Sequence, residues 1–212
     1  MDLSKVIMLR TIFLLPPEPA RVTMRRLQHT LIVCIALLFP IQSLAQEGPF
    51  SPGDHLPAFS MTAPESAAHR NALGLSTEVA TFTLADVDAP AVLIQIFSMY
   101  CPICQREAPE MNRLYELLRE EGLADQITIL GLGAGNSDLE VQVFQERYNV
   151  PFPMISDPDY ILHQAFHAVG TPYFILAQPT DSSETGHVVR LSHLGAFDSA
   201  ETFLESLLDA KQ

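Results

Sequence analysis

Short apolar runs alternate along the chain with longer segments in which apolar residues recur at helical spacing. Residues 91–97 and 127–132 are almost continuously apolar and rich in β-branched side chains, which predicts two strands buried on both faces. A helix is predicted between them, from about Cys101 to Glu121 with Gly122 as its stop. Pro109 is expected to kink this helix, because it removes one backbone hydrogen bond.

The same alternation continues to the end of the chain. Asp138 and Ser199 are expected to cap two later helices, and Gly170-Thr171-Pro172 to end a third. The predicted elements are helices at 138–148, 157–168 and after Ser199, and strands at 152–156, 173–177 and 188–194. Strands that alternate with helices and then form a hairpin predict an α/β fold, with a central mixed β-sheet and helices on both faces.

The segment before the first apolar strand is less regular. Residues 56–61 are expected to be extended, residues 62–78 to form a loop, and residues 79–84 to form a strand because polar and apolar positions alternate there. Glycines at positions 131, 133 and 135 follow the second apolar strand without the G-x-G-x-x-G spacing of a phosphate-binding loop, so this run is also interpreted as a loop.

The N-terminal region has the pattern of an export signal. Arg25-Arg26 is followed by the apolar residues 31–41 and then by Ser43-Leu44-Ala45, which resemble a basic region, an apolar core and a small-residue cleavage site. We expect the start at Met24, cleavage after Ala45 and one domain over residues 46–212. The alternative is an uncleaved membrane anchor, although the apolar run is shorter than the roughly 20 residues of a spanning helix.

Charge and cysteine content narrow the function further. Residues 46–212 hold 23 acidic residues and 7 Lys and Arg, a formal charge of −16, which argues against nucleic acid as a partner. Cleavage would remove Cys34 and leave Cys101 and Cys104 as the only cysteines of an exported protein. This pair closes too short a loop for a structural disulfide and lacks the further ligands of a zinc site, so redox exchange is favoured.

The predicted strand and helix place both cysteines at a helix N-terminus. There the unpaired backbone N–H groups and the positive end of the helix dipole favour a thiolate. Three segments carry a resemblance to a known family: Phe97-Ser98-Met99-Tyr100-Cys101-Pro102-Ile103-Cys104, Glu107-Ala108-Pro109 and Val169-Gly170-Thr171-Pro172-Tyr173-Phe174-Ile175. On these segments, the chain resembles exported thiol-disulfide oxidoreductases of the TlpA/ResA/CcmG class, within the AhpC/TSA-like redoxins. The resemblance implies a thioredoxin-like fold from about Leu56 onward.

The resemblance also implies roles for individual residues. Cys101 would be the attacking thiol and Cys104 the resolving one, while Tyr100 replaces the usual Trp before the first cysteine. Pro172 would be a cis-proline, with the backbone of Thr171 offered to an extended substrate. Glu107 would exchange protons with a thiol; its alternative is an exposed glutamate that complements the helix dipole.

The implied partners are disulfides of exported proteins, including apocytochromes, and a membrane-bound electron donor; the location would be periplasmic or otherwise extracytoplasmic. No cofactor, metal or nucleic acid is expected. Gln95 lies where classical thioredoxins have a buried Asp, and this neutral amide cannot take a proton. His163 and His167 are four residues apart, and without a third ligand they are interpreted as surface or partly packed residues.

Two alternative functions remain open. A peroxiredoxin-like peroxidase is suggested by Ser98, which lies three residues before Cys101, although Ile94 replaces that family's proline. A Sco-like copper carrier would use both cysteines and a later histidine, either His187 or His193, although its cysteines are normally one residue further apart.

Overall fold

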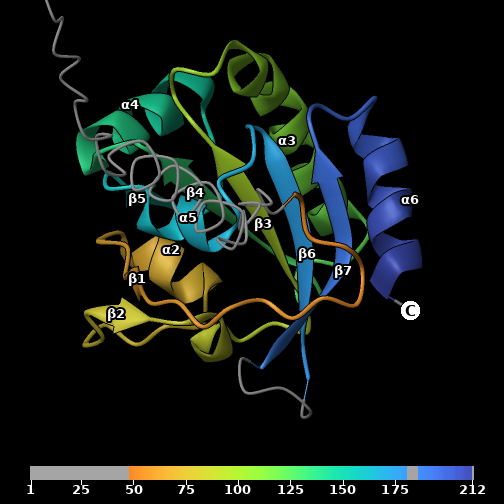
Figure 1. Cartoon of the computed structure of the whole chain (residues 1–212), viewed down its shortest axis with the longest axis horizontal. Helices are drawn as coiled ribbons and strands as arrows, with labels where there is room; N and C mark the ends of the chain where they lie inside the picture. The colour runs from red at the N-terminus through yellow and green to blue at the C-terminus, as the bar shows by residue number, and fades with distance from the viewer. Residues whose placement is uncertain (1–47, 181–185, 212) are drawn as a thin grey trace, which may run out of the picture. The chain divides into compact units, whose positions relative to one another are not determined.

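The strand β3 (Val92–Phe97) is the centre of the sheet, and all its residues are buried. In the computed structural model, which describes residues 48–180 and 186–211, the strand order is β5-β4-β3-β6-β7 (Figure 1). β3 pairs in parallel with β4 (Thr128–Ala134), which pairs in parallel with β5 (Met154–Asp157). The predicted export signal and cleavage site lie outside the described residues.

The other side of β3 is antiparallel. β6 (Tyr173–Pro179) pairs with β3, and β7 (His187–Leu194) pairs with β6 to complete a hairpin. A short N-terminal stretch also runs along the sheet edge, where His55 forms an antiparallel bridge with Val188. The sheet is therefore mixed, as predicted.

Helices cover both faces of the sheet, because successive residues of each strand point to opposite sides. On one face, Leu93 and Phe97 belong to a core cluster with residues of α3 (Pro102–Glu120), α4 (Asp138–Tyr148) and α6 (Ala200–Lys211). On the other face, the central strands pack against α5 (Ile161–Ala165) and the segments before β3. The predicted α/β architecture with helices on both faces is confirmed.

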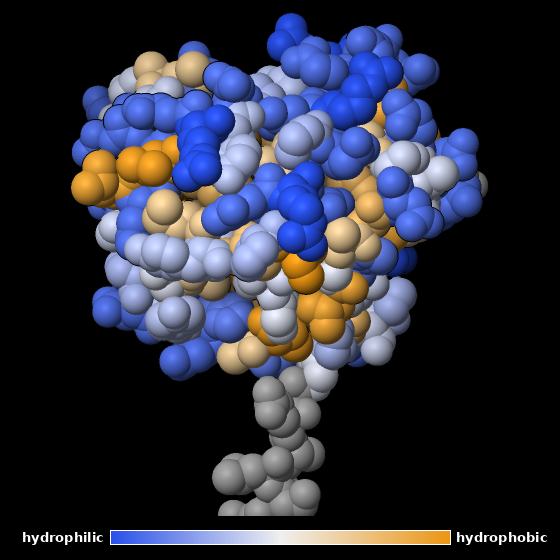
Figure 2. All heavy atoms as spheres, turned by 90° about the horizontal axis from the view of Figure 1, so that it is seen from above, coloured by the Kyte–Doolittle hydropathy of each residue, from blue (hydrophilic) through white to orange (hydrophobic). Residues whose placement is uncertain are grey.

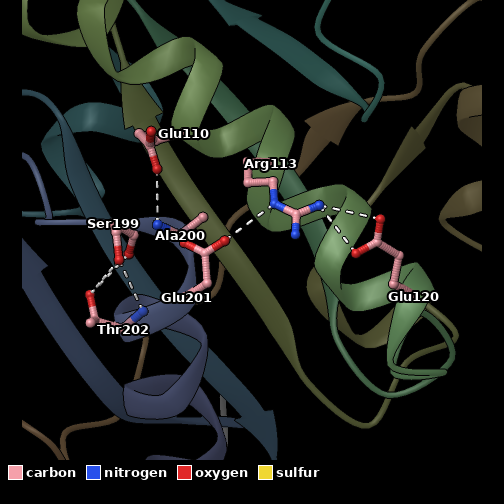
Figure 3. Close-up of polar contacts among 7 residues, drawn as sticks. All are labelled: Glu110, Arg113, Glu120, Ser199, Ala200, Glu201 and Thr202. Carbon is pink, nitrogen blue, oxygen red and sulfur yellow. Dashed lines mark hydrogen bonds and ion pairs between the residues drawn. The ribbon is translucent and has the colours of Figure 1, made fainter.

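α3 and α6 are also joined by polar contacts (Figure 3). The backbone N–H of Ala200 donates to Glu110 Oε2 at 3.0 Å, so a carboxylate of α3 supports the first turn of α6. Arg113 of α3 forms ion pairs with Glu120 at 3.1 Å and Glu201 at 3.3 Å. Ser199 accepts from the N–H of Thr202 at 3.3 Å, which confirms its predicted capping role.

Several expected elements differ near their ends. Ser137, not Asp138, caps α4, because its hydroxyl and the side chain of Glu140 form a reciprocal capping box. The helix expected over 157–168 is shortened to α5, since the carboxylate of Asp157 accepts from the N–H groups of Leu162 and His163 instead of lying within a helix. α3, in contrast, continues through Pro109 as one helix.

The segment before β3 was predicted least well. The loop expected over 62–78 contains α2 (Ala67–Ala72), whose cap Ser66 accepts from the N–H of His69. The strand expected over 79–84 is reduced to β2 (Thr81–Phe82), which pairs with β1 (Met61–Thr62), and a 3₁₀ turn, η1 (Leu84–Asp86), follows it. None of the six residues of α2 is buried, which explains why no apolar periodicity marks this helix.

The glycine run after the second apolar strand also differs from the prediction. Gly131 and Gly133 lie within β4, and only Gly135 follows it, with φ of +65°. A Cβ on Gly133 would approach Val141 to 2.8 Å and both Asn136 and Phe97 to 3.2 Å. The strand uses glycine because neighbouring side chains fill the space that a side chain would need.

Among the described residues, no helix has the length and apolar character needed to cross a membrane.

Gly133→Ala should destabilise the fold by about 1–3 kcal/mol, because the added methyl group overpacks this part of the core. Urea unfolding measures the loss as a lower midpoint at an unchanged slope. Gly48→Ala is the matched control, since nothing lies within 4 Å of a Cβ at that position. Equal stability of the two variants would contradict the role assigned to Gly133.

Candidate active site

Cys101 lies at the junction between β3 and α3, where it forms the N-cap of the helix. Its backbone is extended, with φ of −82° and ψ of 113°, and its Sγ accepts a hydrogen bond from the N–H of Cys104 at 3.2 Å. Pro102 follows at the first helical position, where its missing N–H leaves no helical bond unmade. The sulfur therefore takes the place that a Ser or Asp oxygen has in an ordinary helix cap.

The loop before β6 brings Thr171 to the same sulfur. β6 lies beside β3, with Tyr173 opposite Ile96, so the residues just before β6 reach the end of β3. The thiol of Cys101 donates to the carbonyl oxygen of Thr171 at 3.3 Å, and the Thr171–Pro172 peptide bond is cis, as expected. Two segments 70 residues apart in sequence thus meet at one thiol.

The two thiols have opposite electrostatic environments. Cys104 is fully buried, and burial followed by the hydrogen bond with the Cys101 side chain raises its pKa to about 12. Cys101 is partly exposed; burial opposes its ionisation, but hydrogen bonds with the side chains of Cys104 and Thr171 and with the backbone of the first helical turn outweigh this effect and lower its pKa. Cys101 is therefore the thiol that ionises first.

Glu107 lies one helical turn after Cys104 and is only 5% exposed. Burial raises the pKa of its carboxyl, partly offset by the N–H of Phe197, which donates to Oε1 at 3.1 Å. Nearby Glu110 raises the pKa further, while His193 lowers it. The alternative of an exposed glutamate is therefore wrong, and the carboxyl links α3 to the segment before α6.

Tyr100 is 66% exposed beside Cys101, and its hydroxyl donates to a carboxylate oxygen of Glu140 at the start of α4. This hydrogen bond raises the pKa of Tyr100 and lowers that of Glu140. Figure 2 shows one face of the molecule, turned by 90° from the view of Figure 1, where apolar patches interrupt a largely polar surface. An aromatic ring held next to the thiol is available for contact with a second molecule.

Sequence reasoning missed two residues that hold the turn before Cys101. Asn136, which is fully buried after β4, accepts the N–H of Met99 at 2.8 Å, and Gln105 donates to the carbonyl of Met99 at 2.7 Å. Asn136 could have been found from its place just after a predicted strand, because neighbouring parallel strands end at the same edge of a sheet and the cysteines follow the strand next to it. Gln95, which the sequence places where classical thioredoxins have a buried Asp, is in β3 and only 1% exposed. Its Oε1 has no hydrogen-bond partner among the described residues.

The histidines considered for a metal have other contacts. His163 is partly buried, with its Nε2 at 2.7 Å from the carbonyl of Val169, and His167 Nδ1 lies 2.8 Å from the carbonyl of Gly48. His193 Nε2 lies 3.0 Å from the carbonyl of Ala196. Within residues 48–180 and 186–211, no group of three His, Cys, Asp or Glu is arranged to hold a metal ion.

The model of the AhpC/TSA family matches residues 52–188, which include the dithiol, Glu107 and the Thr171–Pro172 loop. The chain belongs to the AhpC/TSA family. It is similar to the thiol-disulfide oxidoreductase ResA of Halalkalibacterium halodurans, with 30% identity over 124 residues that cover 58% of this chain and 65% of the relative. ResA of Geobacillus kaustophilus is 32% identical over 74 residues, covering 35% and 40%. The chain thus spans less than two thirds of these relatives.

Solved structures of other proteins share the fold of this chain. A Chlorobium tepidum protein described as a candidate thiol:disulfide interchange protein DsbE matches with a TM-score of 0.56 at 17% identity, covering 77% of this chain and 99% of its own. The thioredoxin domain of a Bacteroides vulgatus thiol-disulfide oxidoreductase matches with a TM-score of 0.53 at 17% identity, covering 74% and 99%. The predicted thioredoxin-like fold is confirmed.

Iodoacetamide at pH 7 should modify Cys101 of the reduced protein and leave Cys104 unmodified, because the thiolate is the nucleophile and only Cys101 has a lowered pKa. The rate should rise with pH through a midpoint below the ordinary cysteine range, and mass spectrometry of the digested protein identifies the modified site. If Cys104 of a Cys101→Ser variant were alkylated as fast as Cys101 of the wild type, this assignment would be wrong.

Glu107→Gln should change how stability depends on pH. A carboxyl whose pKa is raised by folding stabilises the fold most at low pH, and this contribution is lost as pH rises through the folded pKa. The amide keeps an oxygen for the N–H of Phe197 but carries no charge. The free energy of unfolding of the variant, relative to wild type, should therefore rise between about pH 4 and about pH 8.

Chemical denaturation at several pH values measures this difference, and Glu116→Gln, an exposed position on the same helix, is the control. A difference between Glu107→Gln and wild type that stays constant across this pH range would refute the raised pKa.

Proposed function

We propose that the protein is an exported thiol-disulfide oxidoreductase that reduces disulfides through Cys101 and Cys104. The observation that carries the proposal is the asymmetry of the two thiols: Cys101 is partly exposed with a lowered pKa, and Cys104 is buried with a pKa of about 12. Dithiol exchange needs one thiol that attacks a substrate and a second one that reacts only within the enzyme. The names of the ResA relatives support the same activity.

In the first step, the Cys101 thiolate attacks one sulfur of a substrate disulfide. The substrate S–S bond breaks, its second sulfur leaves as a thiolate that takes a proton, and a mixed disulfide forms with Cys101. The N–H of Cys104, which donates to Sγ, supports the thiolate before the attack. The substrate would contact Thr171, whose carbonyl lies 3.3 Å from Cys101 Sγ, together with its neighbour Pro172 and the exposed Tyr100.

In the second step, Cys104 loses its proton and attacks Cys101 Sγ. The mixed disulfide breaks, the substrate leaves as a dithiol, and Cys101 and Cys104 form a disulfide, so two electrons pass to the substrate. A thiol with a pKa of about 12 needs a base, and we assign Glu107 to this role because it is buried one helical turn away. One carboxylate oxygen accepts from Phe197 and the other is available for the proton.

The direction of electron flow and the partners follow from the class that the chain resembles. No Lys or His lies between the cysteines to lower the thiol pKa strongly, which favours a reductant over a strong oxidant. The substrates would be disulfides of exported proteins, apocytochromes among them, and a membrane-bound donor would reduce the enzyme again. Export through the signal before Ala45 would place the protein outside the cytoplasm, where such disulfides occur.

The reduction potential of the Cys101–Cys104 couple tests this function. The protein is equilibrated against thiol/disulfide buffers, and a reversible two-electron couple near about −270 mV is expected, whereas one near about −120 mV would make the protein an oxidant. Cys104→Ser should trap a mixed disulfide with a model protein disulfide, and Cys101→Ser should not. If no internal disulfide forms in any buffer, the exchange mechanism fails; peroxide consumption then tests the peroxidase alternative.

A further inference from the structure

The turn before the attacking cysteine is held at Met99, whose two backbone groups are both bonded by side chains. Its N–H donates to Asn136 Oδ1 at 2.8 Å, and its carbonyl accepts from Gln105 Nε2 at 2.7 Å. We propose that Asn136 and Gln105 are positioning residues that fix this turn, and through it the place of Cys101 Sγ between the N–H of Cys104 and the carbonyl of Thr171. The proposal rests on the proposed function only in taking Cys101 as the attacking thiol.

Asn136 is a rigid support. It is fully buried, its own N–H donates to the carbonyl of Gly133 at 3.0 Å, and its carbonyl accepts from the N–H of Asp157 at 3.2 Å. These two bonds fix the backbone of Asn136 to segments at the ends of β4 and β5, and burial restricts the movement of its carboxamide. Asn136 therefore fixes the position of Met99 relative to β4 and β5, the two strands that are parallel to β3.

Gln105 supplies the second support from α3 itself. It lies in the first helical turn, and its N–H donates to the carbonyl of Cys101 at 3.1 Å. Its side chain therefore ties the turn back to the helix that carries both thiols. Asn136 binds Met99 from the sheet and Gln105 binds it from the helix. A shift of Met99 away from the sheet or away from the helix would therefore break one of these hydrogen bonds.

The chemistry of Asn136 suits a position near a thiolate. A carboxamide oxygen accepts an N–H as a carboxylate would, but it adds no negative charge that would oppose ionisation of Cys101. Cys104 is the titratable group in contact with Cys101 Sγ. Glu107 lies one helical turn further along α3, and Glu140 of α4 is bonded to the hydroxyl of Tyr100, the residue before Cys101. None of these groups is altered by a substitution of Asn136 or Gln105.

The test compares Asn136→Ala and Gln105→Ala with two matched controls. Asn112 donates to the carbonyl of Tyr148 at 2.8 Å, and Gln145 donates to the carbonyl of Phe152 at 3.1 Å, so each control also loses a side-chain bond to the backbone, but not at Met99. For all four variants and the wild type, the rate of Cys101 alkylation is measured against pH, and stability is measured by urea unfolding.

Asn136→Ala and Gln105→Ala should each slow Cys101 alkylation at pH 7 by about three- to tenfold, through an upward shift of the titration midpoint by roughly half to one pH unit. Asn112→Ala and Gln145→Ala should leave the midpoint at the wild-type value, even where they lower stability by a similar amount. If Asn136→Ala does not fold, Gln105→Ala carries the test, since its side chain is only partly buried.

An unchanged midpoint in the folded variants, or an equal shift in the controls, would overturn the proposal. This outcome is distinct from failure of the proposed function. The titration of Cys101 involves no substrate, whereas the function is tested by the internal disulfide and by trapping with Cys104→Ser. A protein that exchanges no disulfides could still show the shift, and an active oxidoreductase could still lack it.

Discussion

The hydrogen bond from the N–H of Cys104 to the sulfur of Cys101 is the contact on which the site depends, because it makes a thiol the cap of a helix. An N-cap residue must leave the helical backbone conformation while its side chain turns back over the first turn. This requirement fixes the direction of Sγ and sets one sulfur outside the helix and the other inside it. The accessible and the buried thiol are thus consequences of one capping geometry.

Three neighbouring elements complete this geometry, and each reaches it because of the strand order. β6 lies next to β3 on one side and brings the carbonyl of Thr171 to the cysteine. β4 lies next to β3 on the other side and brings Asn136 to the turn at Met99. The start of α4 then follows directly, and Glu140 reaches the hydroxyl of Tyr100. A thiol at the end of the central strand is therefore surrounded by the ends of its two neighbours.

The carboxylates of α3 serve the fold as well as the site. Glu107 accepts from the N–H of Phe197 and Glu110 from that of Ala200, so the segment that leads into α6 is held by two acids one helical turn apart. Burying a carboxyl raises its pKa and costs stability when it ionises. Glu107 is in this condition, and the same burial raises its affinity for a proton, which supports the role of base for Cys104 that we propose.

The amino-acid sequence by itself determined the central strands, α3, the hairpin and the paired cysteines at a helix start, because these depend on local apolar patterns and on spacing along the chain. It did not determine α2, which buries no side chain, or the extent of β4, where glycine is required by contacts with Val141 and Phe97. Only the tertiary structure decided that Asn136 meets Met99 and that Glu107 meets Phe197. Those contacts join residues 37 and 90 positions apart, and no local pattern records such a pairing.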